Sequence, residues 1–263
     1  MSGRLEGKRA IVFGAGSVGE GWGNGKASAV LFAREGAKVA CVDVNEAAAI
    51  ETADIIAEEG NTALALYANV TQLSQIERTV AACMEEWGGL DVMHFNVGTN
   101  TAGGPLETSE AEWDRILEIN LKAAFLASKA VLPTMLAQGR GSIVNTSSLA
   151  GLRITNYRYV SYYASKAGLN HFTRALALEF ADRGIRANTV SPGLMDTPHI
   201  YAAMASHYAD PAVMRAERAA LSPMKRMGTA WDVAHAALFL ASDDAAYVTG
   251  IDIPVDGGLQ AKV

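Results

Sequence analysis

The chain has 263 residues, of which 50% are hydrophobic and 19% charged, and this composition excludes an intrinsically disordered protein. With 22 basic and 28 acidic residues its net charge is −6, so we expect no nucleic acid and no anionic membrane as partner. No apolar run approaches the ~18 residues of a membrane span and no signal-peptide core follows the first residues, so a cytoplasmic location is expected. Cys41 and Cys83 are too few for a disulfide framework or a metal cluster, and no metal is predicted.

Short apolar runs alternate along the chain with longer stretches that have the period of a helix. A helix is predicted over 26–34, with Gly36 as its stop signal; Asn45 caps a second helix, and Ser109 and Thr229 begin capping boxes. Strands that are apolar on both faces and alternate with helices are typical of a parallel sheet covered on both sides. The sequence therefore predicts an α/β fold with a doubly wound (Rossmann) parallel sheet of about seven strands and helices on both faces. The predicted strands are 10–13, 38–42, 63–67, 90–95, 142–145, 186–190 and 251–255.

Neither a linker nor a repeat divides the chain, so residues 1–263 are expected to form a single domain. Residues 194–227 interrupt the alternation of strands and helices, and they are rich in Met, Ala, His and Tyr. Long insertions in compact domains are often functional lids. We expect 194–227 to be a substrate lid within the domain; a pair of surface helices is the alternative.

Six glycines follow the first predicted strand within residues 14–25. Such a cluster lets the backbone approach a pyrophosphate, whose charge is then met by a helix N-terminus. The G-x-G-x-x-G match at 14–19 would leave three glycines inside the helix, at a cost of about 1 kcal/mol each. A helix that begins near Asn24 avoids this cost, so we predict a phosphate-facing turn at Gly23, Asn24 and Gly25, with Gly14 at the strand end. A flexible loop without a ligand is the alternative.

An acidic residue, Asp43, follows the second predicted strand and comes 18 residues after Gly25. A carboxylate at this position accepts hydrogen bonds from the ribose hydroxyls of an adenosine and repels a 2′-phosphate. Glu20 adds negative charge to the glycine-rich loop. The sequence therefore predicts NAD rather than NADP as cofactor; the alternative is that Asp43 merely opens the turn to Asn45.

Tyr162 and Lys166 are four residues apart at the start of a predicted helix and share one of its faces. A free phenol, with a pKa of ~10, is a poor base at neutral pH. A nearby ammonium favours the phenolate and lowers that pKa, which fits a general base that takes a proton from a hydroxyl group. A single pair of this kind is common by chance, so its weight depends on the residues around it.

These features occur in an order that resembles the short-chain dehydrogenase/reductase family, and the resemblance runs from Gly7 to Leu259. Segments 31–43, 141–151, 184–197 and 226–258 look like that family. The order comprises the glycine loop, Asp43, Asn120, Ser148, Tyr162 and Lys166.

The resemblance implies a role for each of four catalytic positions. Asn120 is similar to an asparagine that holds a water in a proton relay, and Lys166 would hold the nicotinamide ribose. Ser148 is preferred to Ser147 as the serine that binds the reacting oxygen, because Ser148 precedes Gly151 by three residues. Tyr162 is preferred to Tyr163 because only Tyr162 has the four-residue spacing to Lys166.

The resemblance also implies further cofactor contacts. Asn69 and Val70 follow the third predicted strand, Asn96 and Gly98 follow the fourth, and the segment that holds the nicotinamide carboxamide corresponds to Pro192, Gly193, Met195 and Thr197. Two spacings depart from the family: Gly14 to Gly23 is longer by five residues, and Ser148 to Tyr162 is longer by one. The sequence therefore does not predict the path of residues 15–22.

The implied activity is the NAD-dependent interconversion of a secondary alcohol and a ketone, with Tyr162 as general base and acid. An enoyl reductase and a catalytically silent NAD-binding sensor or scaffold are the alternatives. Arg153 and Arg158 either bind an anionic substrate or are solvated. The resemblance also implies a homotetramer, whose interface we expect on the outer faces of helices 113–136 and 162–180, at Ala123, Phe125, Ala127, Phe172 and Leu176.

Overall fold

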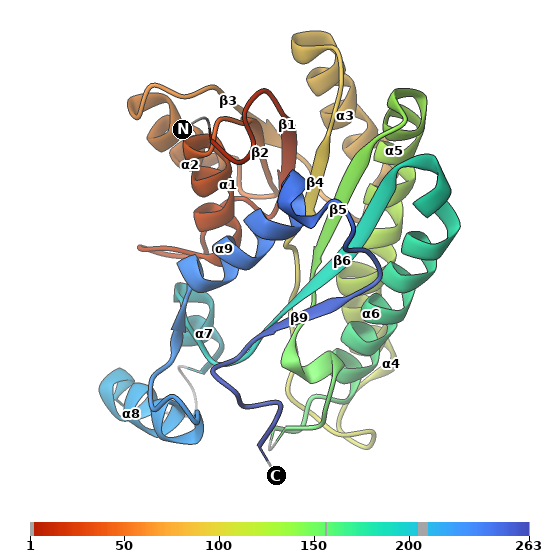
Figure 1. Ribbon diagram of the computed structural model, residues 1–263. Helices are drawn as coiled ribbons and strands as arrows, with labels where there is room; N and C mark the ends of the chain where they lie inside the picture. Colours follow the sequence, from red (N-terminus) through yellow and green to blue (C-terminus); the bar gives the residue numbers. More distant parts are fainter. Residues whose placement is uncertain (1–2, 156, 205–209, 263) are drawn as a thin grey trace.

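The computed structural model describes residues 3–155, 157–204 and 210–262 (Figure 1). All predicted strands are present, with bounds that differ by no more than two residues. The main elements in chain order are β1 (Arg9–Phe13), α1 (Asn24–Arg34), β2 (Lys38–Asp43), α2 (Glu46–Glu58), β3 (Ala63–Tyr67), α3 (Leu73–Trp87), β4 (Val92–Phe95), α4 (Glu110–Leu117), α5 (Ala123–Gln138), β5 (Gly141–Thr146), α6 (Val160–Phe180), β6 (Ile185–Pro192), β7 (Met195–Asp196), α7 (Pro198–Met204), α8 (Pro211–Leu221), β8 (Gly228–Thr229), α9 (Ala230–Ala241) and β9 (Asp252–Val255).

Seven parallel strands form the central sheet in the order β3-β2-β1-β4-β5-β6-β9. The chain builds outward from β1 to β3, returns to the centre, and then builds outward in the other direction from β4. This reversal between β1 and β4 is the topological switch point of a doubly wound sheet, where such folds bind ligands at the carboxyl ends of the strands. The predicted fold class is confirmed. Pro254 lies in the edge strand β9, which tolerates a missing N–H donor.

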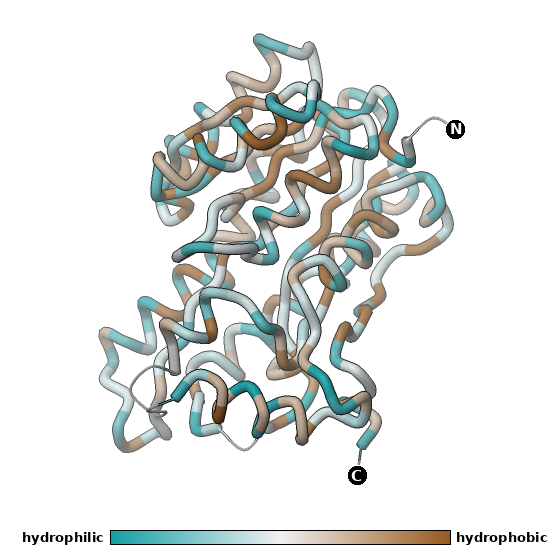
Figure 2. The backbone as a smooth tube through the Cα atoms, turned by 90° about the vertical axis from the view of Figure 1, so that its left-hand side faces the viewer, coloured by the Kyte–Doolittle hydropathy of each residue, from teal (hydrophilic) through white to brown (hydrophobic). Residues whose placement is uncertain are grey.

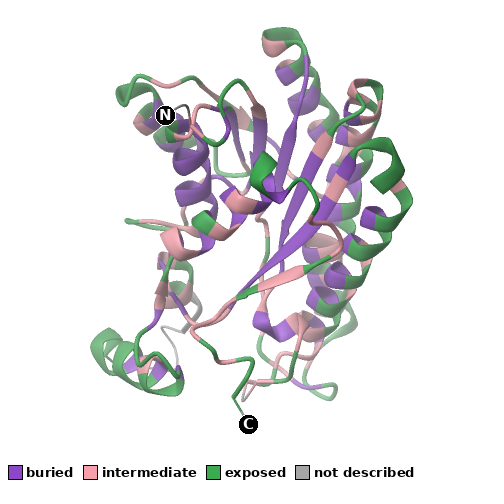
Figure 3. Cartoon of the chain, in the orientation of Figure 1, coloured by how far each residue is buried: buried purple, intermediate pink, exposed green. Residues whose placement is uncertain are grey.

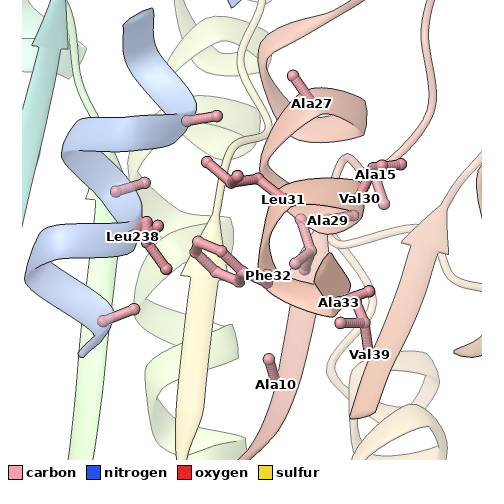
Figure 4. Packing of buried hydrophobic residues seen from close by; sticks show 14 of the residues in the cluster. Ala10, Ala15, Ala27, Ala29, Val30, Leu31, Phe32, Ala33, Val39 and Leu238 are labelled. Carbon is pink, nitrogen blue, oxygen red and sulfur yellow. The ribbon is translucent and has the colours of Figure 1, made fainter. Parts of the chain in front are cut away.

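Alternate residues of the central strands enter two different hydrophobic cores. Ala10 and Val12 of β1 pack with α1, α2 and α9, whereas Ile11 and Phe13 pack with α3, α5 and α6. Figure 4 shows Phe32 of α1 turned toward α9. Hydrophobic residues accordingly follow the central strands, and hydrophilic residues gather at the periphery (Figure 2). Because both faces of the sheet are covered, the strands are apolar without alternation, as the sequence indicated.

The segment 194–227 lies outside the seven-stranded sheet, between β6 and α9. Its two ends are joined by a short parallel pair, β7 with β8, which aligns Met195 with Gly228. Helix α8 lies apart from the sheet and is largely exposed (Figures 1 and 3). Residues 205–209 of the predicted lid lie outside the described residues. None of the helices among the described residues is both long and apolar enough to span a bilayer.

The predicted helix starts are largely confirmed. Helix α1 begins at Asn24, and the side chain of Asn45 caps α2 by accepting the N–H of Ala48 at 3.4 Å. Thr229 and Asp232 form a reciprocal capping box at α9. Ser109 accepts the N–H of Glu112, but the Glu112 carboxylate is directed to the hydroxyls of Thr101 and Ser109. The capping box predicted at Ser109 is therefore only half formed.

The predicted outer faces of the two long helices need a correction. Ala123, Ala127 and Leu176 are buried in the core beneath the sheet, so they are not free to contact another subunit. Phe125 is 47% exposed and lies edge-on to the half-buried Phe172, with ring centres 6.3 Å apart. Helix α5 is apolar on most sides, and periodicity alone therefore did not separate its inner face from its outer face.

Candidate functional site

A cleft of about 1190 Å³ opens at the carboxyl ends of the strands and crosses the switch point. This volume exceeds the range of about 300–1000 Å³ that is usual for one small ligand, and it is consistent with a cofactor and a substrate together. Nearly all of the predicted site residues line it. These are Gly14, Gly23, Asn24, Asp43, Asn69, Val70, Asn96, Gly98, Ser148, Tyr162, Lys166, Pro192, Gly193, Met195 and Thr197.

The glycine turn at the start of α1 has the features of an anion cradle. Gly14 has a φ of 75°, and a Cβ at Gly25 would collide with the Gly14 carbonyl oxygen, so both positions require glycine. Gly25 packs beneath the turn and does not line the cleft, unlike Gly23 and Asn24. No side chain of the described residues caps the helix, and the Ser17 hydroxyl is buried without a partner among them. Free helix N–H groups and an unpartnered hydroxyl are donors that fit a bound pyrophosphate.

The lengthened part of the glycine loop is fixed at both of its sides. The Trp22 ring packs on Trp231 of α9 with ring centres 4.7 Å apart, and Lys26 Nζ lies 5.2 Å above Trp22. On the other side, a Cβ at Gly19 or Gly21 would lie within 3.7 Å of Pro198, the first residue of α7. The extra residues therefore connect the cofactor groove to the segment 194–227.

The adenosine end of the cleft presents an acidic and an amide group. Each oxygen of the Asp43 carboxylate accepts one backbone N–H at 2.9 Å, from Gly16 and from Asn45. A carboxylate has about four acceptor sites, so two remain for ribose hydroxyls. Asn69 Oδ1 accepts two hydrogen bonds from Thr71, which leaves its amide N–H groups toward the cleft.

Asn120 lies behind the cleft in a π-helical turn, Glu118–Lys122, between α4 and α5. Its Oδ1 accepts the N–H of Thr99 at 2.8 Å, and its Nδ2 donates to the Thr99 carbonyl and to Ser165 Oγ. The side chain is fully buried and so fixes the loop after β4. Any water held by Asn120 must therefore use its backbone, and π-helical turns of this kind are frequent at functional sites.

The hydroxyls of the two candidate serines have different hydrogen-bond partners. Ser147 is 3% exposed, and its hydroxyl donates to the Lys166 carbonyl at 3.2 Å. Ser148 Oγ accepts the Ala150 N–H at 3.1 Å and keeps its proton available toward the cleft. Of the two, Ser148 has the hydroxyl that can donate to a ligand.

The hydroxyls of the two candidate tyrosines also have different surroundings. The Tyr163 hydroxyl is held by Thr155 and by the carbonyl of Tyr157, 2.7 Å away, so it fixes the loop that precedes α6. Tyr162 lines the cleft, and Lys166 Nζ lies 5.8 Å from the centre of its ring. A Cβ at Gly98 would come within 3.0 Å of that nitrogen, so glycine makes room for the lysine.

One electrostatic expectation, a lowered pKa of Tyr162, is not met. Burial raises the pKa of Tyr162 above its ordinary value, while the neighbouring Ser148 hydroxyl lowers it. Burial lowers the pKa of the Lys166 ammonium to about 8, and its Nζ donates to the carbonyl of Thr146 at 2.9 Å. The ammonium uses one of its three N–H groups for this carbonyl, and in this structure burial outweighs every effect that would lower the pKa of Tyr162.

The two arginines singled out in the sequence already have partners. Arg153 donates to backbone carbonyls near the C-terminus, among them that of Gln260 at 2.6 Å. Arg158 pairs with Glu107 at 2.7 Å and is exposed. Sequence reasoning assigned no role to Arg218 of α8, a buried cation that lines the cleft, or to His199 of α7, which also lines it. The available signal was the pair Met214 and Arg218, one turn apart, on the buried face of an otherwise polar helix.

Comparison with known proteins identifies the family of this chain. A family model described as enoyl-(acyl carrier protein) reductase matches residues 19–260. The chain is 40% identical over all of its length to the 2,5-dichloro-2,5-cyclohexadiene-1,4-diol dehydrogenase LinX of Sphingobium indicum, which it covers completely. It is 36% identical to a cyclohexanol dehydrogenase of Acinetobacter (100% of this chain, 98% of the relative) and 37% identical to the 3-oxoacyl-(acyl-carrier-protein) reductase FabG of Thermotoga maritima (97% and 99%).

A solved structure gives the same answer. The crystal structure of a putative short-chain dehydrogenase/reductase from Burkholderia xenovorans superposes with a TM-score of 0.95 at 44% identity, over 99% of each chain. The sheet order, the cleft at the switch point and these matches agree with one another. The chain belongs to the short-chain dehydrogenase/reductase family.

Proposed function

We propose that this oxidoreductase interconverts a secondary alcohol and a ketone with NAD as cofactor. The observation that carries the proposal is the convergence of Ser148, Tyr162 and Lys166 on the cleft that also contains the glycine turn. Relatives whose names describe dehydrogenases of a cyclic diol and of cyclohexanol support an alcohol as substrate.

The chemistry assigned to the chain's own residues is proton transfer and charge stabilisation. The Tyr162 hydroxyl, as phenolate, takes the proton from the substrate hydroxyl during oxidation and returns it during reduction. Ser148 donates a hydrogen bond to the reacting oxygen and stabilises the charge that develops there. Lys166 stabilises the phenolate, and Asn120 supports the proton path behind it. When bound, the oxidised nicotinamide supplies the hydride acceptor and a positive charge.

NAD is proposed over NADP because of the adenosine end of the cleft. Asp43 has acceptor sites left for ribose hydroxyls, and a 2′-phosphate there would meet its negative charge. The free helix N–H groups at Asn24 and the buried Ser17 hydroxyl would bind the pyrophosphate. Pro192, Gly193, Met195 and Thr197 line the opposite end and would hold the carboxamide.

We propose further that the protein is a single-domain enzyme with a substrate lid. Residues 1–263 form one domain, and the segment 194–227 closes over the substrate and excludes water from the site. We also propose a homotetramer, in which the exposed Phe125 is buried against another copy. A cytoplasmic location fits the two cysteines, Cys41 and Cys83, which are both free and buried.

The direct test uses purified protein with NAD or NADP and a panel of cyclic secondary alcohols, followed by NADH absorbance. We expect oxidation of at least one alcohol with NAD. Reduction of an enoyl thioester instead, with no alcohol oxidised, would favour the enoyl reductase that the family model is named for. By resemblance, the four-residue spacing of Tyr162 and Lys166 argues against that second candidate. NAD binding without any turnover would favour the sensor or scaffold.

A further inference from the structure

Arg218 is a buried cation at the substrate end of the cleft. It is 5% exposed, although α8 is otherwise largely exposed, and only Met214 shares its buried face. Its guanidinium donates one hydrogen bond, from Nη1 to the Tyr157 hydroxyl at 3.1 Å. Its Nε is buried and has no hydrogen-bond partner among the described residues. A buried guanidinium that uses so few of its five donors is an incomplete site.

Among the described residues, no neighbour balances the charge of Arg218. Arg215 and Arg226, which flank it in the sequence, pair with Asp196 and Asp232. No side-chain carboxylate of the described residues lies within ion-pair distance of Arg218. Burial of a charge without a partner is costly, and proteins tolerate it where a ligand completes the pair. Arg218 therefore faces the cleft without a carboxylate partner among the described side chains.

A row of aromatic rings connects Arg218 to the catalytic tyrosine. The Arg218 Cζ lies 6.0 Å from the ring centre of Tyr157, and that ring is stacked on Tyr159 at 5.6 Å with 19° between the planes. Tyr159 in turn contacts Tyr162 edge-on at 6.2 Å. All four residues line the same cleft. The rings therefore form an aromatic wall between the guanidinium and Tyr162, against which an apolar or cyclic substrate body can pack.

Besides Arg218 and Lys166, two more cations line the cleft. Lys262 and Arg153 line it as well, whereas the acidic residues on the cleft wall are Asp43, at the adenosine end, and Glu118. Arg153 is exposed and its Nη1 donates to backbone carbonyls, and the exposed Lys262 donates weakly to the Leu221 carbonyl at 3.5 Å. Arg218 differs from both because it is buried and its Nε has no partner among the described residues.

We propose that Arg218 binds a carboxylate of the substrate, so that the preferred substrate is a secondary alcohol with a carboxylate at the end remote from the carbinol carbon. The planar fork of arginine matches a carboxylate with two parallel hydrogen bonds, here from the free Nε and an Nη. This inference rests on the proposed function for the reacting end of the substrate. The carboxylate site itself can be tested without turnover.

The binding test uses cyclohexanecarboxylate as probe, with NAD present, and reads calorimetric affinity and the rise in Tm. We expect binding to the wild type and to Tyr162→Phe, a loss of affinity on the order of 10- to 100-fold in Arg218→Gln, and partial rescue in Arg218→Lys. The matched control is Arg215→Gln, which removes a charge from the exposed side of the same helix and should bind as the wild type does. Absence of binding to the wild type, or equal losses in the Arg215 and Arg218 variants, would overturn the proposal.

The kinetic test compares 4-hydroxycyclohexanecarboxylate with cyclohexanol. We expect the wild type and Arg215→Gln to prefer the hydroxy acid in kcat/KM, and Arg218→Gln to lose that preference through KM. A preference that persists in Arg218→Gln would overturn the proposal. If no alcohol is oxidised by any variant but the probe still binds through Arg218, the proposed reaction has failed and the carboxylate site stands.

Discussion

Lys166 Nζ lies 5.8 Å from the centre of the Tyr162 ring, and it donates to the carbonyl oxygen of Thr146. The lysine is 2% exposed, and no carboxylate of the described residues pairs with it. The fold thus holds a buried ammonium beside the proposed base at a cost to its own stability. Such a cost is expected where a charge serves catalysis.

Replacement of this lysine should therefore separate stability from activity. Because burial lowers the pKa of Lys166 from 10.5 to about 8, the charged form costs the folded state about 3 kcal/mol at neutral pH. Loss of the hydrogen bond to Thr146 offsets part of this, so Lys166→Met should raise the free energy of unfolding by about 1–2 kcal/mol and abolish turnover. The gain should be full below pH 8 and fade as the pH rises from 8 to 10.5. Urea denaturation at pH 7 and pH 10 measures it; a variant less stable than the wild type at pH 7 would contradict this account.

Cofactor choice should depend on Asp43. The wild type should have a higher kcat/KM with NAD than with NADP, and Asp43→Ser should weaken NAD while relieving the exclusion of NADP, because the ribose acceptor and its charge are removed together. Asn69→Ala is a control at the same end of the cleft that changes no charge, and it should leave the NAD/NADP ratio near the wild-type value. Steady-state kinetics with each cofactor provide the ratio. Equal wild-type efficiency with both cofactors would defeat the argument.

Acid should destabilise the protein through His94. This histidine is fully buried in β4, where burial lowers its pKa from 6.5 to about 4 and the Val144 carbonyl opposes that shift. Between these two values the unfolded chain binds more protons than the folded one. Stability should therefore fall by about 3 kcal/mol from this residue alone as the pH drops from 6.5 to 4.

The measurement is the difference in unfolding free energy between the wild type and His94→Leu at pH 7 and at pH 4. The variant should lose less stability on acidification, since the titrating group is gone. His171→Leu, at an exposed histidine, is the control for the change in composition. Parallel pH profiles for the wild type and His94→Leu would show that His94 does not contribute.

The lengthened glycine loop should act on cofactor affinity. Trp22 fixes it to Trp231 of α9, so Trp22→Ala should free the loop and raise the KM for NAD several-fold. The rate at saturating NAD should change little, because the residues that move protons are elsewhere. Trp22→Phe keeps an aromatic contact and should restore most of the affinity. An unchanged KM in Trp22→Ala would mean that the contact with α9 does not order the cofactor groove.

The sheet and the end of β1 could be predicted because their causes are local in the sequence. Strands buried on both faces are apolar without interruption, and the cost of glycine within a helix placed the start of α1 at Asn24. The choice of Ser148 over Ser147 rests on spacing, and the structure adds the reason that Ser147 is bonded to the Lys166 carbonyl.

Other features depend on residues far apart in the chain. Lys166 of α6 donates to the carbonyl of Thr146 in β5, and Arg218 lines the cleft although α8 lies apart from the sheet. The pKa of Tyr162 depends on burial, which no residue spacing reports. Ala123 was predicted on the outer face of α5 but is buried, because that helix is apolar on most sides and its sequence does not mark the inner face.

The central claim is that Tyr162 is the general base, and the most direct measurement is turnover and NAD affinity of Tyr162→Phe beside Tyr163→Phe, with the best alcohol found for the wild type. Tyr162→Phe should lose turnover and keep its NAD affinity, because only the hydroxyl that carries the proton is removed. Tyr163→Phe should lower Tm, since its hydroxyl fixes the loop at Thr155, and should retain most of kcat. Comparable kcat in the two variants, or turnover by Tyr162→Phe near the wild-type level, would contradict the assignment.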